Sequence, residues 1–141
     1  MIDVENYVID KVAQHVHADT PSAQIYSSHV RTPSVFPCVM IYESSNTTYE
    51  DTRTADGIER HAEVRYTIEI CTNDTTGKKE NAKRLMRIID DTMQEMGFYR
   101  ASRQYTFGTN ESSVFVALTT YRGLVGEGPS GDDTNLIVYR R

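Results

Sequence analysis

The sequence lacks several features that mark whole classes of protein. Its 141 residues include no tryptophan, only two cysteines and no apolar run near the ~18 residues that span a bilayer. We therefore expect no transmembrane helix and no membrane partner. Cys38 and Cys71 form no C-x-x-C or C-x-x-H motif, so they predict no zinc site. The acidic segment from Met1 to Glu5 lacks the basic and apolar regions of a secretory signal, which predicts a cytoplasmic protein with reduced thiols.

Positive charge is also scarce. Fifteen lysines and arginines against twenty aspartates and glutamates give a net charge of −5. A protein that binds nucleic acid through its phosphates usually carries a basic excess. Specific nucleic-acid binding is therefore not predicted, although an acidic surface would suit a wall past which DNA slides.

Motifs that carry chemistry are missing as well. The Gly77-Lys78 pair lacks the earlier glycine and the following serine or threonine of a phosphate-binding loop. No serine lies in a nucleophile elbow. We therefore predict no cofactor and no enzymatic activity.

The histidines and paired acids give a weak metal signal. His15 and His17 lie two positions apart on a predicted helix, so they point to different faces, and His61 opens a predicted strand. Asp90 and Asp91 are adjacent on a second predicted helix. Because this spacing is not that of a ligand set, a small metal-dependent enzyme using His61, Asp90 or Asp91 is the least favoured alternative.

One central stretch organises the rest of the chain. Residues 61–71 alternate strictly between an apolar face (Ala62, Val64, Tyr66, Ile68 and Ile70) and a polar face (Glu63, Arg65, Thr67 and Glu69). That alternation predicts a strand with one face on a core. After the polar break at 72–77, apolar residues recur at helical spacing and Gly97 supplies a stop. The apolar set is Ala82, Leu85, Met86, Ile89, Met93 and Met96.

The segments before this stretch predict one more helix and two strands. Valines repeat every four residues across 3–17, where Asp3 can cap a helix that ends before Pro21. Residues 23–30 are expected to form a short edge strand. Residues 38–43 are apolar on both faces, which indicates a central strand covered on both sides. The polar segment 44–60 is then the tip of a long hairpin.

The segments after the central helix predict a hairpin and a separate tail. Residues 98–106 and 114–121 are strand-like and are joined by a polar turn. A glycine-rich linker is expected over 123–135, followed by a strand-like segment that pairs either with its own sheet or with a neighbour's. The predicted fold class is α+β, with a mostly antiparallel sheet against two helices. Residues 1–123 form its one domain and residues 124–141 are a flexible linker and arm.

The order of elements in the central stretch resembles a known family. The run Val64–Phe98 combines the alternating strand with motifs at fixed places, namely Cys71-Thr72-Asn73-Asp74, Gly77-Lys78-Lys79, Ile88-Ile89-Asp90-Asp91 and Met96-Gly97-Phe98-Tyr99-Arg100. It is similar to the tail-terminator proteins (tail-completion, head–tail joining proteins) of tailed bacteriophages and prophages. The resemblance continues upstream through Phe36–Glu43 and Asn46–Thr48, and downstream into Val114–Tyr121, so it covers residues 1–123.

The resemblance implies a structural role in the virion. Such proteins form a ring, typically a hexamer, that caps the head-proximal end of the tail tube and presents a surface to the head connector. The implied partners are copies of the chain, the tail tube protein, the head-completion connector and, as a further candidate, the tail sheath. The implied location is the virion tail or neck, assembled in the bacterial host cytoplasm. The tail from Gly123 departs from the shorter C-termini of the family, which leaves open a neighbouring neck component.

Three groups of residues are candidates for these contacts. The first candidate subunit interface is the face of the central helix that carries Lys79, Lys83, Arg87, Asp91 and Glu95. The second is the C-terminal strand with Leu136, Ile137, Val138 and Tyr139. Contact with the tail tube or the lumen is expected from Tyr49, Glu50, Asp51, Arg53, Asp56 and Glu59.

The helix face is unusual because its bases precede its acids. That order opposes the helix dipole, which prefers acids first and bases last. A solvent-exposed face explains most charge runs, and Arg87 can pair with Asp91 one turn on. The alternative is a bipolar face that meets a neighbouring subunit, as a ring with two different complementary patches requires. A monomeric adaptor that binds a peptide along its sheet edge is the main rival function.

Overall fold

A computed structural model describes residues 3–31, 33–48, 61–107, 114–126 and 137–139 of the chain. The two helices are α1 (Glu5–Asp19) and α2 (Lys78–Met96). The strands are β1 (Gln24–Tyr26), β2 (Cys38–Thr48), β3 (His61–Thr72), β4 (Tyr99–Phe107), β5 (Phe115–Gly126) and β6 (Ile137–Tyr139).

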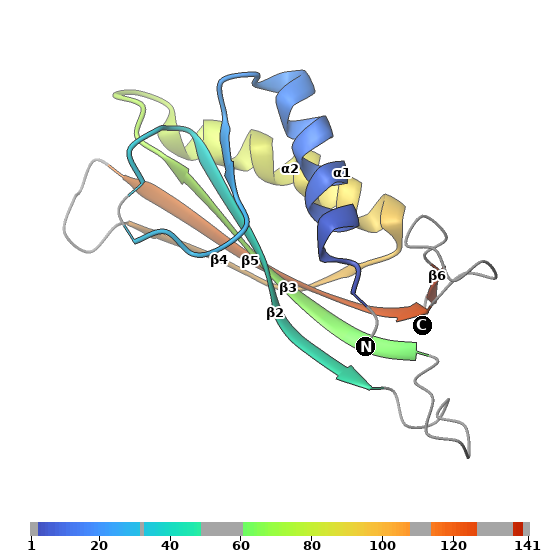
Figure 1. The fold of residues 1–141 in the computed structure, drawn as a ribbon. Coiled ribbons are helices and arrows are strands. Elements are labelled where there is room, and N and C mark those ends of the chain that lie inside the picture. Colours follow the sequence, from blue (N-terminus) through green and yellow to red (C-terminus); the bar gives the residue numbers. More distant parts are fainter. Residues whose placement is uncertain (1–2, 32, 49–60, 108–113, 127–136, 140–141) are drawn as a thin grey trace, which may run out of the picture.

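The strands form a single sheet in the order β1-β2-β3-β5-β4, with β6 also paired to β5. Every pairing is antiparallel except that of β1 with β2. Both helices cover the same face of this sheet (Figure 1). The predicted α+β class, with a mostly antiparallel sheet against two helices, is therefore confirmed.

The core lies between the helices and one face of β3. The five apolar residues that alternate along β3 (Ala62, Val64, Tyr66, Ile68 and Ile70) are completely buried, whereas the intervening residues stay at least partly exposed. The predicted stripe of α2 faces them and is buried, apart from Met96, which is only partly buried. Burial of these side chains is the main stabilising term of the fold, at about 25 cal/mol for each Å² of apolar surface.

The first helix depends on docking more than on helix propensity. Val8, Val12 and Val16 are completely buried. The N-cap residue is Val4, not the predicted Asp3, although Asp3 accepts a hydrogen bond from the Glu5 amide at 3.1 Å. The helix starts and ends two residues later than predicted, which is within the usual fraying of helix ends.

A hydrogen bond joins the two helices. The Thr92 hydroxyl lies 2.7 Å from both the Ile88 carbonyl oxygen and His15 Nδ1. A hydroxyl donates once, so when Thr92 donates to Ile88, His15 must donate to Thr92. The contact therefore fixes one tautomer of His15.

The long hairpin is present, but its strands are longer than predicted. β2 was expected to end at Glu43 and instead continues to Thr48, which pairs with Ala62. Ser44 is the extra residue of a bulge in this pairing. The polar residues 44–48 join the sheet because backbone groups, not side chains, make the ladder. Residues 49–60 lie outside the described residues.

The opposite face of the sheet carries a second, smaller apolar cluster. Cys38 and Cys71 are direct cross-strand partners there, and both are buried free thiols. Phe36 and Val30 pack on them from the segment that precedes β2. This confirms that β2 is covered on both faces. It also explains why β1 is three residues long rather than eight, because Val30 and Phe36 leave the sheet edge and pack on this face.

The C-terminal part of the sheet differs from the prediction. β5 was expected to end at Tyr121 and to give way to a linker at Gly123, but it continues to Gly126. The division after residue 123 therefore falls inside a strand. Gly123 serves close packing instead of flexibility, since the Phe98 ring lies against its backbone.

The last described residues extend the same sheet. The backbone of β6 pairs with Leu124–Gly126 of its own chain, so the arm adds to its own sheet in this structure. The predicted hairpin of β4 and β5 is confirmed. Residues 127–136 lie outside the described part of the chain.

Candidate functional site

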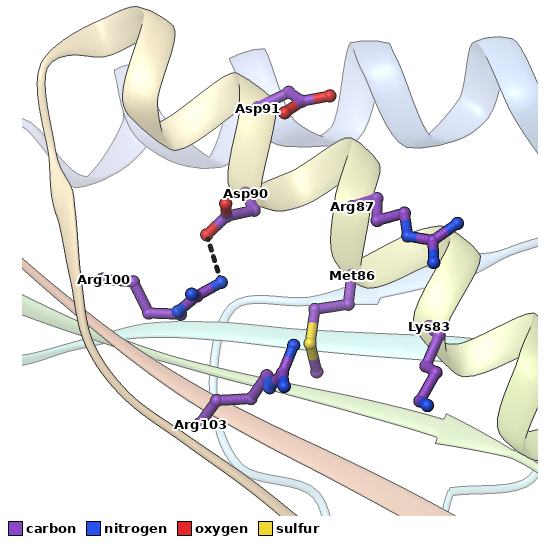
Figure 2. Close-up of a pocket in the computed structure, with 7 residues that line it drawn as sticks. All are labelled: Lys83, Met86, Arg87, Asp90, Asp91, Arg100 and Arg103. Atoms are coloured by element: carbon purple, nitrogen blue, oxygen red, sulfur yellow. Dashed lines mark hydrogen bonds and ion pairs between the residues drawn. The ribbon is translucent and has the colours of Figure 1, made fainter.

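A pocket of about 160 Å³ lies between α2 and the edge strand β4. Its lining residues come from these two elements alone (Figure 2). They are Lys83, Met86, Arg87, Asp90, Asp91, Arg100 and Arg103. We call this set the basic pocket.

The helical periodicity of α2 supplies one wall of the basic pocket. Lys83, Arg87 and Asp91 are spaced four residues apart, so they form a row along one side of the helix. Met86 and Asp90 form the adjacent row, nearer the sheet. In Figure 2, Met86 points down toward β4, whereas Asp91 points away from it.

A bulge in β4 supplies the other wall. The pairing with β5 shifts between Arg100 and Ser102, so Arg100 lies opposite Tyr121 and Arg103 lies opposite Thr119. Those two β5 residues are buried on the helix-covered face. Both arginines therefore point to the helix side although they are three positions apart, which a regular strand does not allow.

Asp90 is the anchored carboxylate of the pocket. It accepts hydrogen bonds from the Tyr121 hydroxyl at 2.9 Å, from Arg100 Nη1 at 3.3 Å and from Gln94 Nε2 at 2.8 Å. Its side chain is 15% exposed against 40% for Arg100, so the ion pair is half sheltered from water. Burial, followed by the contact with Asp90, raises the pKa of Tyr121, which keeps that hydroxyl protonated as a donor.

The pairing of Arg87 with Asp91 that helical spacing permits is not formed. Within the described part of the chain, no ion pair joins these two exposed side chains. Asp90 instead forms an ion pair with an arginine, and that arginine, Arg100, lies on β4. The spacing along one helix could not reveal a partner that a strand supplies.

The basic pocket has the opposite sign to the protein as a whole. Four cationic side chains face two carboxylates, a local charge of +2 on a chain of net charge −5. One carboxylate is already bound to Arg100. Arginine forks bind carboxylate and phosphate oxygens in pairs, so the chemistry of the pocket is that of an anion-binding surface.

The helix residues predicted as an interface are only partly brought together. Lys83, Arg87 and Asp91 line the basic pocket, whereas Lys79 and Glu95 are exposed elsewhere on α2 and do not line it. Arg100 and Arg103 are not among the site residues predicted from the sequence. The sequence gives little sign that they belong to a site, because the pattern of a polar strand does not reveal the bulge that turns both to the same side.

The other predicted contact residues, in the C-terminal strand and in the segment 49–60, do not lie at the basic pocket or fall outside the described residues. Ile137, Val138 and Tyr139 form β6 and pair through their backbone with β5, and Leu136 lies outside the described residues. The candidates for tail-tube or lumen contact all fall in the segment 49–60, which is also outside them. These are Tyr49, Glu50, Asp51, Arg53, Asp56 and Glu59.

A second charged cluster lies at the other side of the helical layer. The Glu43 amide on β2 donates to Glu5 Oε2 of α1 at 3.2 Å, and the Tyr66 hydroxyl donates to Glu43 Oε1 at 3.4 Å. Burial, with the nearby charges of Glu5 and Asp3, raises the pKa of Glu43. We call Asp3, Glu5 and Glu43 the acidic cluster. It concentrates negative charge at the α1–β2 edge.

Two further observations concern metals and membranes. Among the residues that the structure describes, no three or more histidine, cysteine, aspartate or glutamate side chains gather in a way that could hold a metal ion. No helix in the same residues combines the length and apolar character needed to cross a bilayer.

The chain was also compared with known proteins. No family model matches the sequence, and no curated protein matches it.

Proposed function

We propose that this chain is a structural protein of a phage tail or neck. As a tail terminator it forms a ring, typically a hexamer, at the head-proximal end of the tail tube. There it stops tube growth and presents a surface to the head-completion connector. Its partners are copies of itself, the tail tube protein and the connector, with the tail sheath as a further candidate, and its location is the virion.

The order of elements supports this proposal. The alternating strand lies in β3, the turn 73–77 leads into α2, and β4 begins two residues after Gly97. These are the features on which the resemblance to tail terminators was based. Their agreement with the fold is support at the level of architecture, because one fold can host many functions.

The observation that carries the proposal is the charged edge formed by β4. Within the described residues, this nine-residue strand has a neighbour on one side only, and the basic pocket lies beside it. An unpaired strand edge with clustered arginines is a surface suited to binding another protein. A protein that acts through contacts with its neighbours needs such a surface.

The test uses tail tubes assembled from the tube protein of the phage or prophage that encodes the chain. Purified protein is added, and negative-stain images record where it binds and how long the tubes become. We expect binding at one end only and arrest of growth at that end. Tubes that bind nothing at either end, and grow to the same length with and without the protein, would overturn the proposal.

The same β4 edge also fits a second function, a monomeric adaptor that adds an extended peptide as a further strand. Light scattering across a concentration series separates the two. Rings of about six subunits favour the terminator, since closed heterologous rings are what it requires. A strict monomer that leaves tube growth unchanged favours the adaptor.

A further inference from the structure

The two charged clusters lie at opposite edges of the same sheet, because β1 pairs with β2 only at Cys38–Met40 and leaves Glu43 beyond its end. The acidic cluster is formed where α1 contacts β2, and the basic pocket is formed where α2 contacts β4. The sheet order places β3 and β5 between β2 and β4. Three strand spacings separate these edges by about 14 Å. That exceeds the Debye length of about 8 Å at physiological salt, so the clusters do not neutralise each other within one copy.

Each cluster carries an excess of one charge sign among the residues that form it. In the acidic cluster, the Glu43 carboxylate receives neutral donors, the Tyr66 hydroxyl and the Asn46 side-chain amide. The described ion pairs of the chain supply no cation to any of its three carboxylates. In the basic pocket, the cations outnumber the carboxylates by two.

We propose that the basic pocket of one copy binds the acidic cluster of the next copy. This inference depends on the proposed function, because it names the subunit contact of the proposed ring. The two patches differ, so the contact is head to tail and uses one patch from each copy. Such heterologous contacts repeat from copy to copy and close into a ring when the rotation permits.

The chemistry of the contact follows from the residues. Arg87 and Arg103 line the pocket, and both side chains are exposed. Asp3 is exposed and Glu5 half-buried at the acidic cluster, so their carboxylates can meet arginine forks. Opposite charges on the two patches also speed association and disfavour the wrong pairing of basic with basic.

The test reverses one patch at a time. The basic-patch variant carries Arg87→Glu and Arg103→Glu, and the acidic-patch variant carries Asp3→Lys and Glu5→Lys. Assembly is followed by light scattering and native mass spectrometry, with the protein alone and on tail tubes. We expect each variant alone to assemble at least about tenfold more weakly than wild type.

Mixing the two variants separates this contact from a general charge effect. An intact acidic patch on one variant meets an intact basic patch on the other, and the two reversed patches also have opposite signs. The equimolar mixture should therefore recover assembly with the variants alternating. A symmetric contact that uses one patch twice would not recover in this way.

Matched controls reverse the same number of charges outside both patches. Lys11→Glu with Arg31→Glu is the control for the basic patch, because both side chains are exposed and do not line the pocket. Asp10→Lys with Glu80→Lys is the control for the acidic patch, because both carboxylates are exposed on helices and neither belongs to the acidic cluster. Both controls should assemble like wild type.

Far-UV circular dichroism and melting curves establish that every variant folds. If a reversal unfolds the protein, the neutral pair Arg87→Gln and Arg103→Gln replaces it. The salt dependence of wild-type assembly gives a second readout, because a contact between charges weakens as the ionic strength rises.

The outcomes distinguish this inference from the proposed function. Variants that assemble like their controls, or a mixture that stays dissociated, overturn the contact while tail-tube capping remains intact. A wild-type chain that never self-associates, alone or on tubes, overturns the contact as well, and tube-end binding then decides the proposed function separately.

Discussion

Substitution of Gly123 by alanine tests the most consequential difference between sequence and structure. In a flexible linker, Gly→Ala stabilises by about 0.4–1 kcal/mol, because it restricts the unfolded chain. In β5, the new Cβ would lie 2.4 Å from Cδ1 and 2.6 Å from Cε1 of Phe98. Two carbon atoms normally approach to about 3.5–4.0 Å. Gly123→Ala is therefore expected to stabilise the protein if Gly123 lies in a linker, and to destabilise it if Gly123 lies in β5.

The magnitude follows from how Phe98 is held. Its ring is 2% exposed and meets the Tyr66 ring edge to face, with centroids 5.6 Å apart at an interplanar angle of 83°. Relief of an overlap of about 1 Å must displace this ring within a packed core. Overpacking costs about 1–3 kcal/mol, and disturbance of the aromatic pair adds about 0.5–1.5 kcal/mol. We expect Gly123→Ala to lower the free energy of unfolding by about 2–4 kcal/mol.

Thermal and urea denaturation measure this loss. For a domain of this size the melting temperature should fall by about 5–15 °C. A double-mutant cycle with Phe98→Ala identifies the cause. In that background the added methyl group enters a vacated space, so Gly123→Ala should change stability by less than about 0.5 kcal/mol.

Two results would refute the reasoning. A neutral or stabilising Gly123→Ala would place this residue outside the packed strand. A loss that persists unchanged when Phe98 is truncated would mean that the overlap with its ring is not the cause.

Three further substitutions test other parts of the structure. The raised pKa of Glu43 means that the folded state binds the proton of this carboxyl more tightly than the unfolded state does. Wild-type stability therefore falls as the pH rises from the ordinary pKa of glutamate through the higher pKa of Glu43 in the folded protein. Melting curves across pH should therefore show Glu43→Gln more stable than wild type above this window and equal to it below; a constant difference would contradict the assignment. Thr92→Val removes the hydrogen bond to His15 and should cost about 1–2 kcal/mol in urea denaturation, and a change below about 0.5 kcal/mol would show that the helices dock without it. Gly77 has φ +76°, and a Cβ there would make only an ordinary contact with Glu80 Oε2 at 3.9 Å. Gly77→Ala should therefore cost about 1–2 kcal/mol and Gly77→Asn less, whereas equal costs would exclude backbone strain as the cause.

The sequence predicted those elements whose side chains alternate or repeat. The apolar faces of β3 and α2 followed directly from periods of two and 3.6 residues, because burial of one face requires that pattern. The prediction was wrong where backbone pairing, not side-chain character, decides the structure. The polar residues 44–48 and the glycine-containing residues 123–126 join the ladder although their composition is that of loops.

Only the α2 side of the basic pocket was predicted from the sequence, for a related reason. Helical spacing placed Lys83, Arg87 and Asp91 on one face, and that row does line the basic pocket. The other half depends on a bulge in β4, which turns Arg100 and Arg103 to the same side. No periodic pattern records a bulge, so residues from a distant strand could be joined to the helix only through the three-dimensional structure.

The charge order of α2 acquires a physical meaning from this arrangement. Bases at the start of a helix oppose its dipole at a cost of some tenths of a kcal/mol each. The fold adds to that cost, because the β4 arginines increase the positive charge beside Lys83 and Arg87 instead of neutralising it. The basic pocket therefore has two electrostatic costs, the opposed helix dipole and the added β4 arginines, and one anchored carboxylate, Asp90, to offset them. Functional sites retain unfavourable local arrangements of this kind. A carboxylate-bearing edge of a neighbouring subunit removes both costs at once, and the same chain carries that edge at the far side of its sheet.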